Sequence, residues 1–249
     1  MMNLTNLIAS GETVDVYQDG NTAIKVFKDS EAKIKALNEA LTHSRVETTG
    51  LPMPVIHEVS VIDGNWAITM DHIEGKTLHQ IMKEDPAHLS EYVEKMVDIQ
   101  LEIHTKSMPL LSKLKDQLAG QINSLTSIDD TKRYELLTRL ESMPKHKKLC
   151  HGNFTPMNLI VSGDKITIVD WVAARQGNAS ADVARTYLML CLDFPEAAEL
   201  YLNNFCQKSG TAKKYVQEWL PIVAAAQLTN DKPEEKKLLL KWIDVVQYE

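Results

Sequence analysis

The sequence predicts an α+β protein, with a small N-terminal part built on an antiparallel sheet and a larger, mainly helical C-terminal part. Residues 1–70 contain short β-branched runs separated by Asp-Gly-Asn turns, which is the pattern of antiparallel hairpins. From Thr77 onward, apolar residues recur at helical spacing. One later stretch, Leu149 to Trp171, returns to the strand pattern. It predicts a single β-hairpin within the helical part.

The N-terminal part is expected to hold about five strands and one helix. The strands are predicted at residues 4–9, 13–18, 22–28, 55–62 and 66–73. Asp-Gly-Asn turns at 19–21 and 63–65 connect two pairs of them. The helix is predicted over about residues 30–45, with Ser30 as its N-cap. Its larger apolar residues are spaced for one face: Ile34, Leu37 and Leu41.

The C-terminal part is expected to be a set of helices around one central helix. The helices are predicted at about residues 78–84, 89–105, 111–125, 130–142, 178–192, 195–207, 211–228 and 233–246. The segment 89–105 is apolar around most of its circumference, so we place it at the centre. Pro221 should kink or split the helix over 211–228, because a proline inside a helix removes a hydrogen bond and clashes with the preceding turn.

Composition limits the classes of function. With 249 residues, of which 44% are hydrophobic, the chain can bury a large core as one domain or two lobes. The net charge of −7 disfavours nucleic acid as a partner. Three cysteines without metal-ligand spacing suit a reducing cytoplasm: Cys150, Cys191 and Cys206. No apolar run approaches the ~20 residues of a membrane span, so we expect no membrane partner and a cytoplasmic location.

The stretch from Leu149 to Trp171 carries the clearest chemical signal. It has a His-Gly loop with two asparagines, then an apolar run, a Ser-Gly-Asp-Lys turn, and a second apolar run that ends in an aspartate. The polar residues are His151, Asn153, Asn158 and Asp170. A hairpin would bring such groups together at its base, where they can hold a metal ion and a phosphate. Turn and strand-end chemistry is the alternative explanation for Asn158 and Asp170.

This stretch resembles the aminoglycoside phosphotransferase and choline kinase group. Members of that group share the protein-kinase-like fold, and their catalytic loop reads H-G-D-x-x-x-x-N, followed by a hairpin that ends in Asp. Here the corresponding residues are His151, Gly152, Asn153, Asn158 and Asp170. The resemblance covers nearly the whole chain. It implies a bilobal fold with an N-lobe over residues 1–70, a hinge over 71–77 and a C-lobe over 78–249.

The resemblance also implies a site for ATP and Mg²⁺. Asn158 and Asp170 correspond to the Mg²⁺ ligands of the family, and their hard oxygen donors suit that ion. His151 is expected to support the loop structurally. Asp182, in the segment Ala181 to Arg185, corresponds to the family's Asp that holds the catalytic-loop backbone. A preference of carboxylates for a helix N-terminus explains Asp182 equally well.

Further nucleotide-binding residues are implied in the N-lobe. Lys25 corresponds to the strand lysine that contacts the α and β phosphates, and Glu39 to the helix glutamate that holds it. The alternative is a solvent-facing Lys25 and a Glu39 that pairs with Lys35. Gly11 would lie in a loop over the phosphates. The backbone of the hinge would pair with the adenine edge: Met70, Asp71 and His72.

Asn153 departs from the family pattern. The family has an Asp at this position, which takes the proton from the substrate hydroxyl, whereas an amide accepts a hydrogen bond but has no useful basicity. Three explanations are open: a slow or differently assisted phosphotransferase, a nucleotide-binding pseudokinase, and an active enzyme whose Asp has been replaced. We expect transfer of the γ-phosphate to a hydroxyl of a small molecule such as an aminoglycoside, a macrolide, an amino alcohol or a sugar. The alternative is a catalytically silent nucleotide-binding or interaction protein.

Overall fold

The computed structural model describes residues 4–244 and divides the chain into two compact units. Unit 1 runs up to Glu84 and also takes in Pro156–Ala174. Unit 2 consists of Asp85–Thr155 and the chain from Arg175 onward. The hairpin of the Leu149 to Trp171 stretch therefore belongs to unit 1, although the sequence on both sides of it belongs to unit 2. The predicted lobes and hinge divide the chain at other residues than these two units, and they stay a prediction.

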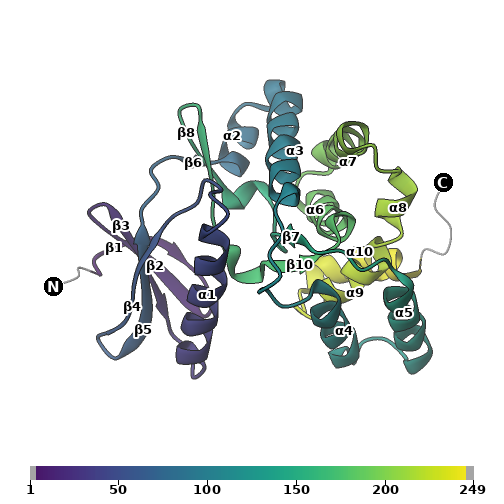
Figure 1. Cartoon of the computed structure of the whole chain (residues 1–249), viewed down its shortest axis with the longest axis horizontal. Coiled ribbons are helices and arrows are strands. Elements are labelled where there is room, and N and C mark those ends of the chain that lie inside the picture. Colours follow the sequence, from purple (N-terminus) through teal and green to yellow (C-terminus); the bar gives the residue numbers. More distant parts are fainter. Residues whose placement is uncertain (1–3, 245–249) are drawn as a thin grey trace. The chain divides into compact units, whose positions relative to one another are not determined.

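Unit 1 is built on a five-stranded antiparallel sheet in the order β1-β2-β3-β5-β4. Its strands are β1 (Asn6–Ser10), β2 (Val14–Asp19), β3 (Thr22–Phe27), β4 (Ile56–Ile62) and β5 (Asn65–Asp71). One helix, α1 (Ala32–Glu47), packs on one face of this sheet (Figure 1). The core between them contains Phe27, Ala36, Ala40 and Ile68. The five predicted strands and the single helix are confirmed.

Two details predicted for α1 are wrong. Ser30 does not cap the helix: the N-cap is Glu31, which makes no side-chain cap bond, and the N–H of Glu31 bonds the carboxylate of Asp29 instead. The face that carries the larger apolar residues points to solvent, since Ile34, Leu37 and Leu41 are exposed. The buried face consists of smaller and polar residues: Ala36, Glu39, Ala40, His43 and Val46. Small residues let the helix approach the sheet closely, which spacing alone does not reveal.

The rest of unit 1 is the hairpin and its partner elements. A short strand, β6 (Lys76–Thr77), pairs with β8 (Leu159–Ser162), which pairs in turn with β9 (Lys165–Ile168). The helix α2 (Leu78–Glu84) follows β6. Gly75 permits this arrangement. Its φ is 149°, and a Cβ there would lie 2.3 Å from the carbonyl oxygen of Val161.

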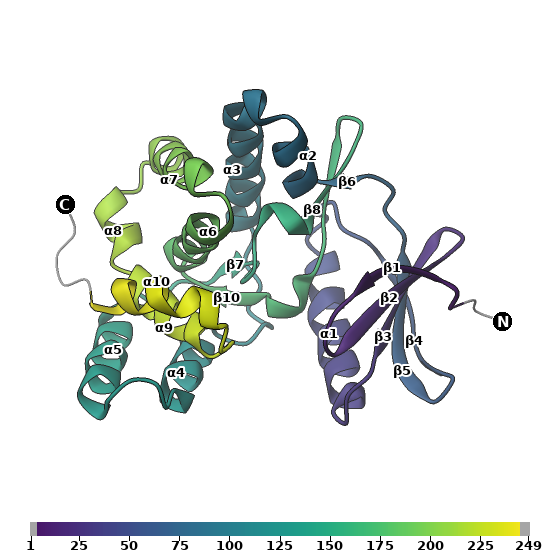
Figure 2. The same cartoon turned by 180° about the vertical axis from the view of Figure 1, so that it is seen from behind.

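Unit 2 is mainly helical. Its helices are α3 (Leu89–Thr105), α4 (Leu114–Ser124), α5 (Asp130–Ser142), α6 (Ala179–Asp193), α7 (Pro195–Ser209), α8 (Lys213–Gln217), α9 (Leu220–Leu228) and α10 (Pro233–Asp244). Two short strands, β7 (Lys148–Cys150) and β10 (Arg175–Gly177), form an antiparallel ribbon among them. Figure 2 shows α4 and α5 side by side, next to α9 and α10.

The predicted helix over 211–228 is split as expected. It becomes α8 and α9, and Pro221 lies in the first turn of α9, where a helix needs no N–H donor. The predicted end of the last helix at Val246 lies outside the described residues. The α+β fold class is confirmed, with an N-terminal five-stranded antiparallel sheet and a helical C-terminal part.

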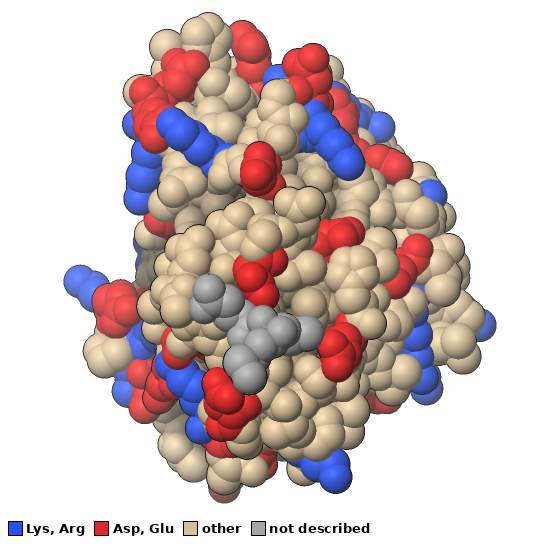
Figure 3. Space-filling model, turned by 90° about the vertical axis from the view of Figure 1, so that its left-hand side faces the viewer, with Lys and Arg blue, Asp and Glu red and all other residues tan. Residues whose placement is uncertain are grey.

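The described residues form no helix that is both long enough and apolar enough to span a bilayer. On the face shown in Figure 3, acidic and basic side chains are interspersed. No large area of that face carries basic side chains alone.

Candidate functional site

The alternation of β3 sets the position of Lys25. Ile24 and Val26 are buried in the core on one side of the sheet, so Lys25 points to the side of Phe27, on which α1 packs. Its side chain is only 18% exposed, and its Nζ lies 5.8 Å from the centre of the Phe27 ring. A partly buried ammonium in such surroundings requires a partner of opposite charge.

Glu39 of α1 is that partner. Lys25 Nζ donates a hydrogen bond of 2.6 Å to Glu39 Oε1, and the glutamate is buried. Burial raises the pKa of Glu39, and the charge and hydrogen bond of Lys25 offset only part of this rise. Lys35, the alternative partner considered for Glu39, instead makes an ion pair with Asp29. The structure thus brings Lys25 and Glu39 together.

The β8–β9 hairpin brings Asn158 and Asp170 to the same place. Leu159 pairs with Ile168, and the N–H of Val169 donates to the carbonyl of Asn158 at 3.0 Å, so the two polar residues flank the base of the hairpin. Asp170 has φ 63° and ψ 59°, a left-handed conformation that few residues other than Gly, Asn and Asp adopt. Asp170 Oδ1 lies 3.7 Å from Lys25 Nζ.

These four side chains line one cavity of about 360 Å³ in unit 1. Other lining residues are mostly apolar and come from β1, β2, β3, the end of β5 and the hairpin: Ile8, Ala9, Val16, Ala23, Met70, Ile73, Ile160 and Val169. The cavity therefore has mainly apolar walls and a polar cluster of an ammonium, an amide and two carboxylates, while His43, Asp71 and His72 also line it. Among the described residues, no cluster of three His, Cys, Asp or Glu side chains is placed to hold a metal ion.

The predicted hinge residues also line the cavity, but two of their backbone N–H groups are engaged. The N–H of Asp71 donates to Val55 at 3.0 Å and that of His72 to Asn21 at 2.9 Å. The Asp71 carboxylate accepts from the N–H of Val55 at 3.0 Å, and this hydrogen bond lowers its pKa. These two N–H groups are therefore already satisfied within unit 1.

Gly11 lies in the turn between β1 and β2. Its N–H donates to the carbonyl of Val14 at 2.8 Å, and its carbonyl accepts from Lys28 Nζ at 2.9 Å. It is not among the residues that line the cavity, whereas Ile8 and Ala9 of the adjoining strand are.

The loop with His151 and Asn153 lies in unit 2 and is held by Asp182 of α6. Asp182 Oδ1 accepts from the N–H of Gly152 at 2.8 Å, and Oδ2 accepts from the N–H of His151 at 3.1 Å. The side chain of Asp182 is buried. Burial acts to raise the pKa of this carboxyl, but hydrogen bonds from His104 and Gly152 outweigh it, so that the pKa lies below its ordinary value.

His151 is fully buried, and its Nδ1 accepts from the N–H of Asn153 at 3.3 Å. This geometry fits the structural role predicted for His151. Asn153 itself is half-buried.

Two residues of α3 that the sequence did not single out complete this anchor. His104 Nε2 lies 3.0 Å from Asp182 Oδ2, and Gln100 Nε2 lies 3.3 Å from the same atom. Both belong to the buried face of α3. The sequence did offer a signal for both: each is a polar residue at a position where the helical spacing of α3 calls for an apolar one.

Comparisons with known proteins identify the family and the fold. The model of the phosphotransferase enzyme family matches residues 5–219. Among curated proteins, none matches the chain. Solved structures also match the chain, but at sequence identities of 14–17%, which support a shared fold and nothing further.

A thermostable mutant of aminoglycoside phosphotransferase APH(4)-Ia, in its apo form, has 14% identity and a TM-score of 0.71, with 96% of this chain and 92% of that one covered. A choline/ethanolamine kinase family protein from Mesorhizobium loti has 15% identity and a TM-score of 0.66, with 98% and 89% covered. ADP-bound aminoglycoside phosphotransferase APH(2'')-Ib has 17% identity and a TM-score of 0.65, with 97% and 91% covered. Since the family model spans most of the sequence, the chain belongs to the phosphotransferase enzyme family.

Proposed function

We propose that the chain binds ATP with Mg²⁺ in the cavity of unit 1 and transfers the γ-phosphate to a hydroxyl of a small molecule. One observation carries the proposal. The Lys25–Glu39 ion pair, Asn158 and Asp170 meet in a cavity whose remaining walls are mainly apolar. Apolar walls suit a nucleobase, and an oriented ammonium beside hard oxygen donors suits its phosphates.

The donor set fits Mg²⁺. Asn158 offers an amide oxygen and Asp170 a carboxylate, and Mg²⁺ is usually bound by one or two protein groups together with substrate phosphates and water. When bound, the ion would supply positive charge that offsets the negative charge of the phosphate oxygens. Lys25, held by Glu39, would add a second positive charge on the nucleotide.

Asn153 sets the expected rate. Its amide can accept the hydrogen bond of the acceptor hydroxyl and so orient it, but it cannot take the proton. General-base assistance contributes roughly 10²- to 10⁴-fold, whereas most of the acceleration of phosphoryl transfer comes from positioning and charge stabilisation. We therefore propose slow transfer rather than none.

We infer the class of the phosphate acceptor from the similar structures. The similar structures include aminoglycoside phosphotransferases, one of them in a ternary complex with ADP and hygromycin B, and a choline/ethanolamine kinase family protein. For this chain we propose a hydroxyl-bearing small molecule of the aminoglycoside, amino-alcohol or sugar class. A cytoplasmic location suits both the use of ATP and the three free cysteines.

A second candidate is favoured by Asn153 itself. A chain that lacks the base at this position while keeping the nucleotide cavity would serve as a catalytically silent nucleotide-binding protein. It would act through partners rather than through turnover.

The two candidates are separated by phosphoryl transfer from Mg·ATP to a panel of aminoglycosides, amino alcohols and sugars. We expect slow transfer by the chain as it stands and a gain of roughly 10²- to 10⁴-fold in Asn153→Asp. Asn65→Asp makes the same chemical change in the β4–β5 turn and should have no effect. If both the parent and Asn153→Asp bind the nucleotide but neither transfers its phosphate, the result would favour the catalytically silent nucleotide-binding protein.

A further inference from the structure

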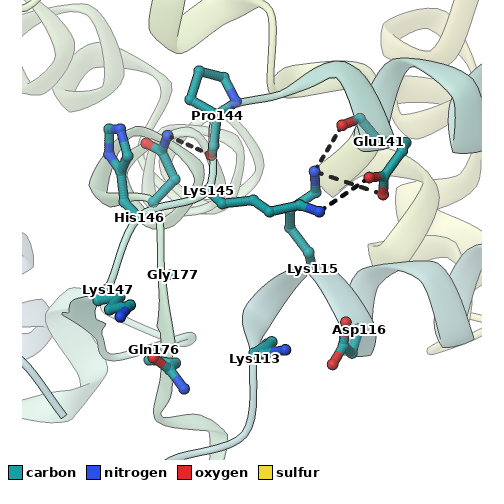
Figure 4. Close-up of a pocket in the computed structure, with 11 residues that line it drawn as sticks. Lys113, Lys115, Asp116, Glu141, Pro144, Lys145, His146, Lys147, Gln176 and Gly177 are labelled. Carbon is teal, nitrogen blue, oxygen red and sulfur yellow. Dashed lines mark hydrogen bonds and ion pairs between the residues drawn. The ribbon is translucent and has the colours of Figure 1, made fainter. Parts of the chain in front are cut away.

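Unit 2 contains a second cavity, of about 320 Å³, that the proposed reaction does not use. Three segments line it: the start of α4, the loop from the end of α5 to β7, and the end of β10 (Figure 4). Gly177 of β10 pairs with Lys148 of β7, whereas Arg175 pairs with Cys150, the residue before His151. The cavity therefore lies at the end of the β7–β10 ribbon opposite the loop of Asn153.

The lining is basic in an otherwise acidic protein. Figure 4 shows lysine side chains from α4 and from the α5–β7 loop around an open space. The charged lining residues are Lys113, Lys115, Asp116, Glu141, Lys145 and Lys147. Four ammonium groups against two carboxylates leave two positive charges in excess, while the whole chain carries −7. A local excess of this sign favours an anion of charge two or more.

The lysines differ in what they already bind. Lys115 Nζ donates to the carbonyls of Glu141 and Met143, each at 3.0 Å, and so closes the end of α5. Lys145 Nζ lies 3.1 Å from the Glu141 carboxylate. Lys113 and Lys147 make no ion pair with any described residue, and their ammonium groups stay available to a ligand.

The backbone that carries these lysines is fixed. The N–H of Gln176 donates to the carbonyl of Ser112 at 3.0 Å, which ties the segment before Lys113 to β10. Ser107 Oγ donates to the carbonyl of Lys147 at 2.9 Å, and Asn178 Nδ2 donates to the carbonyl of Pro144 at 3.4 Å. A site whose backbone is tied at each segment binds a ligand with little loss of backbone entropy.

The α4 helix adds a second attraction for an anion. Lys113 is its N-cap and makes no side-chain cap bond, while Asp116 in its first turn offsets part of the helix dipole. The first N–H groups of a helix have no acceptor within the helix and carry the positive end of its dipole. Phosphate groups bind at such helix starts, and lysine is a common partner of phosphate as a point charge.

We propose that this cavity is a binding site for a small molecule that carries a phosphate group. The excess of two positive charges matches a phosphate monoester, which carries about −1.5 to −2 at pH 7. A cavity of about 320 Å³ is the size of a small-molecule site and lacks the extended basic surface that a nucleic acid duplex requires.

The probe is inorganic pyrophosphate, titrated into the full-length chain by calorimetry at low salt. In Lys113→Ala/Lys147→Ala we expect the affinity to fall by about tenfold or more, since two charge-assisted contacts are lost. The matched control is Lys236→Ala/Lys237→Ala, which removes the same two charges from exposed positions of α10 and should change the affinity by less than about twofold. Lys25→Ala alters the nucleotide cavity and so reports any pyrophosphate that binds there; it should lower the affinity less than Lys113→Ala/Lys147→Ala does.

Four results would overturn the proposal. An equal loss in the α10 pair would show attraction by net charge alone, and a loss in Lys25→Ala as large as in Lys113→Ala/Lys147→Ala would place the anion in the nucleotide cavity instead. Absence of binding up to about 10 mM pyrophosphate would show that the cavity has no useful affinity for phosphate. Succinate, a dianion without phosphorus, should bind more weakly, and tighter binding of succinate would assign the cavity to dicarboxylates.

Discussion

At the scale of single residues, the loop that carries Asn153 depends on Asp182. The carboxylate accepts bonds from two backbone N–H groups of the loop and from two side chains of α3. A buried carboxylate is stabilised only by such a complete set of donors, because burial alone disfavours its charge. The pKa of Asp182 lies below its ordinary value because the hydrogen-bond donors stabilise the charged form more than burial destabilises it.

Replacing this carboxylate should therefore cost stability. In Asp182→Asn, one oxygen becomes an NH₂ group that faces donors, and we expect a loss of about 3 kcal/mol at pH 7. Because the folded pKa lies below the ordinary 3.8, the contribution of the ionised group is present above pH 3.8 and is lost as the pH falls through the lowered pKa. Urea midpoints should thus differ most at neutral pH and converge in acid.

The control for this measurement is Asp98→Asn, which removes an exposed carboxylate of α3 and should cost less than about 1 kcal/mol. An unchanged midpoint in Asp182→Asn at pH 7 would show that the loop does not need this anchor.

Some residues of the site could be predicted from the sequence, and others could not. The family resemblance placed Lys25 beside Glu39, and the turn chemistry of the hairpin was enough to bring Asn158 near Asp170. Gln100 and His104 were not foreseen. Their spacing puts both on the apolar face of α3, but it does not reveal that their partner is a buried carboxylate on another helix.

At the scale of elements, the pairing of β6 with β8 of the hairpin depends on a close backbone approach at Gly75. A Cβ at this position would meet the Val161 carbonyl at 2.3 Å, and φ 149° is a conformation that side chains rarely adopt. Gly163, in the turn of the same hairpin, also has a positive φ, 61°, but has open space around it.

Substituting each of these two glycines separates the cost of backbone strain from the cost of a steric clash. We expect Gly163→Ala to cost about 1 kcal/mol from its backbone conformation alone. Gly75→Ala should cost clearly more and weaken the β6–β8 pairing, because the backbone must also move. Thermal unfolding of both variants is the measurement, and equal losses would mean that the contact with Val161 is relieved without cost.

The helix α1 shows where element-level prediction fails. Its spacing of Ile34, Leu37 and Leu41 is that of a core-facing stripe, yet these side chains are exposed, whereas Ala36 and Ala40 are buried. The position of the sheet decides which face is covered, and the ion pair of Glu39 with Lys25 requires the smaller face to turn inward. Neither fact can be read from the helix sequence.

At the scale of the whole molecule, the chain keeps the fold of its family at 14–17% identity to the solved structures compared above. The fold class, the five strands with their helix, and the hairpin followed from local patterns such as the Asp-Gly-Asn turns, whereas the order of the strands within the sheet was not predicted. The basic cavity of unit 2 did not, because its lysines come from two segments that lie far apart in the sequence, the start of α4 and the α5–β7 loop. Only the folded chain brings such residues together.

The measurement that tests the central claim most directly is calorimetric binding of Mg·ATP to three chains: the parent, Asp170→Ala and Asp164→Ala. Asp164 is an exposed residue in the turn of the same hairpin and serves as the matched control. We predict Mg²⁺-dependent binding in the micromolar range by the parent and by Asp164→Ala, and a loss of at least about tenfold in Asp170→Ala. Absence of binding by the parent up to millimolar ATP, or equal binding by all three chains, would contradict the account.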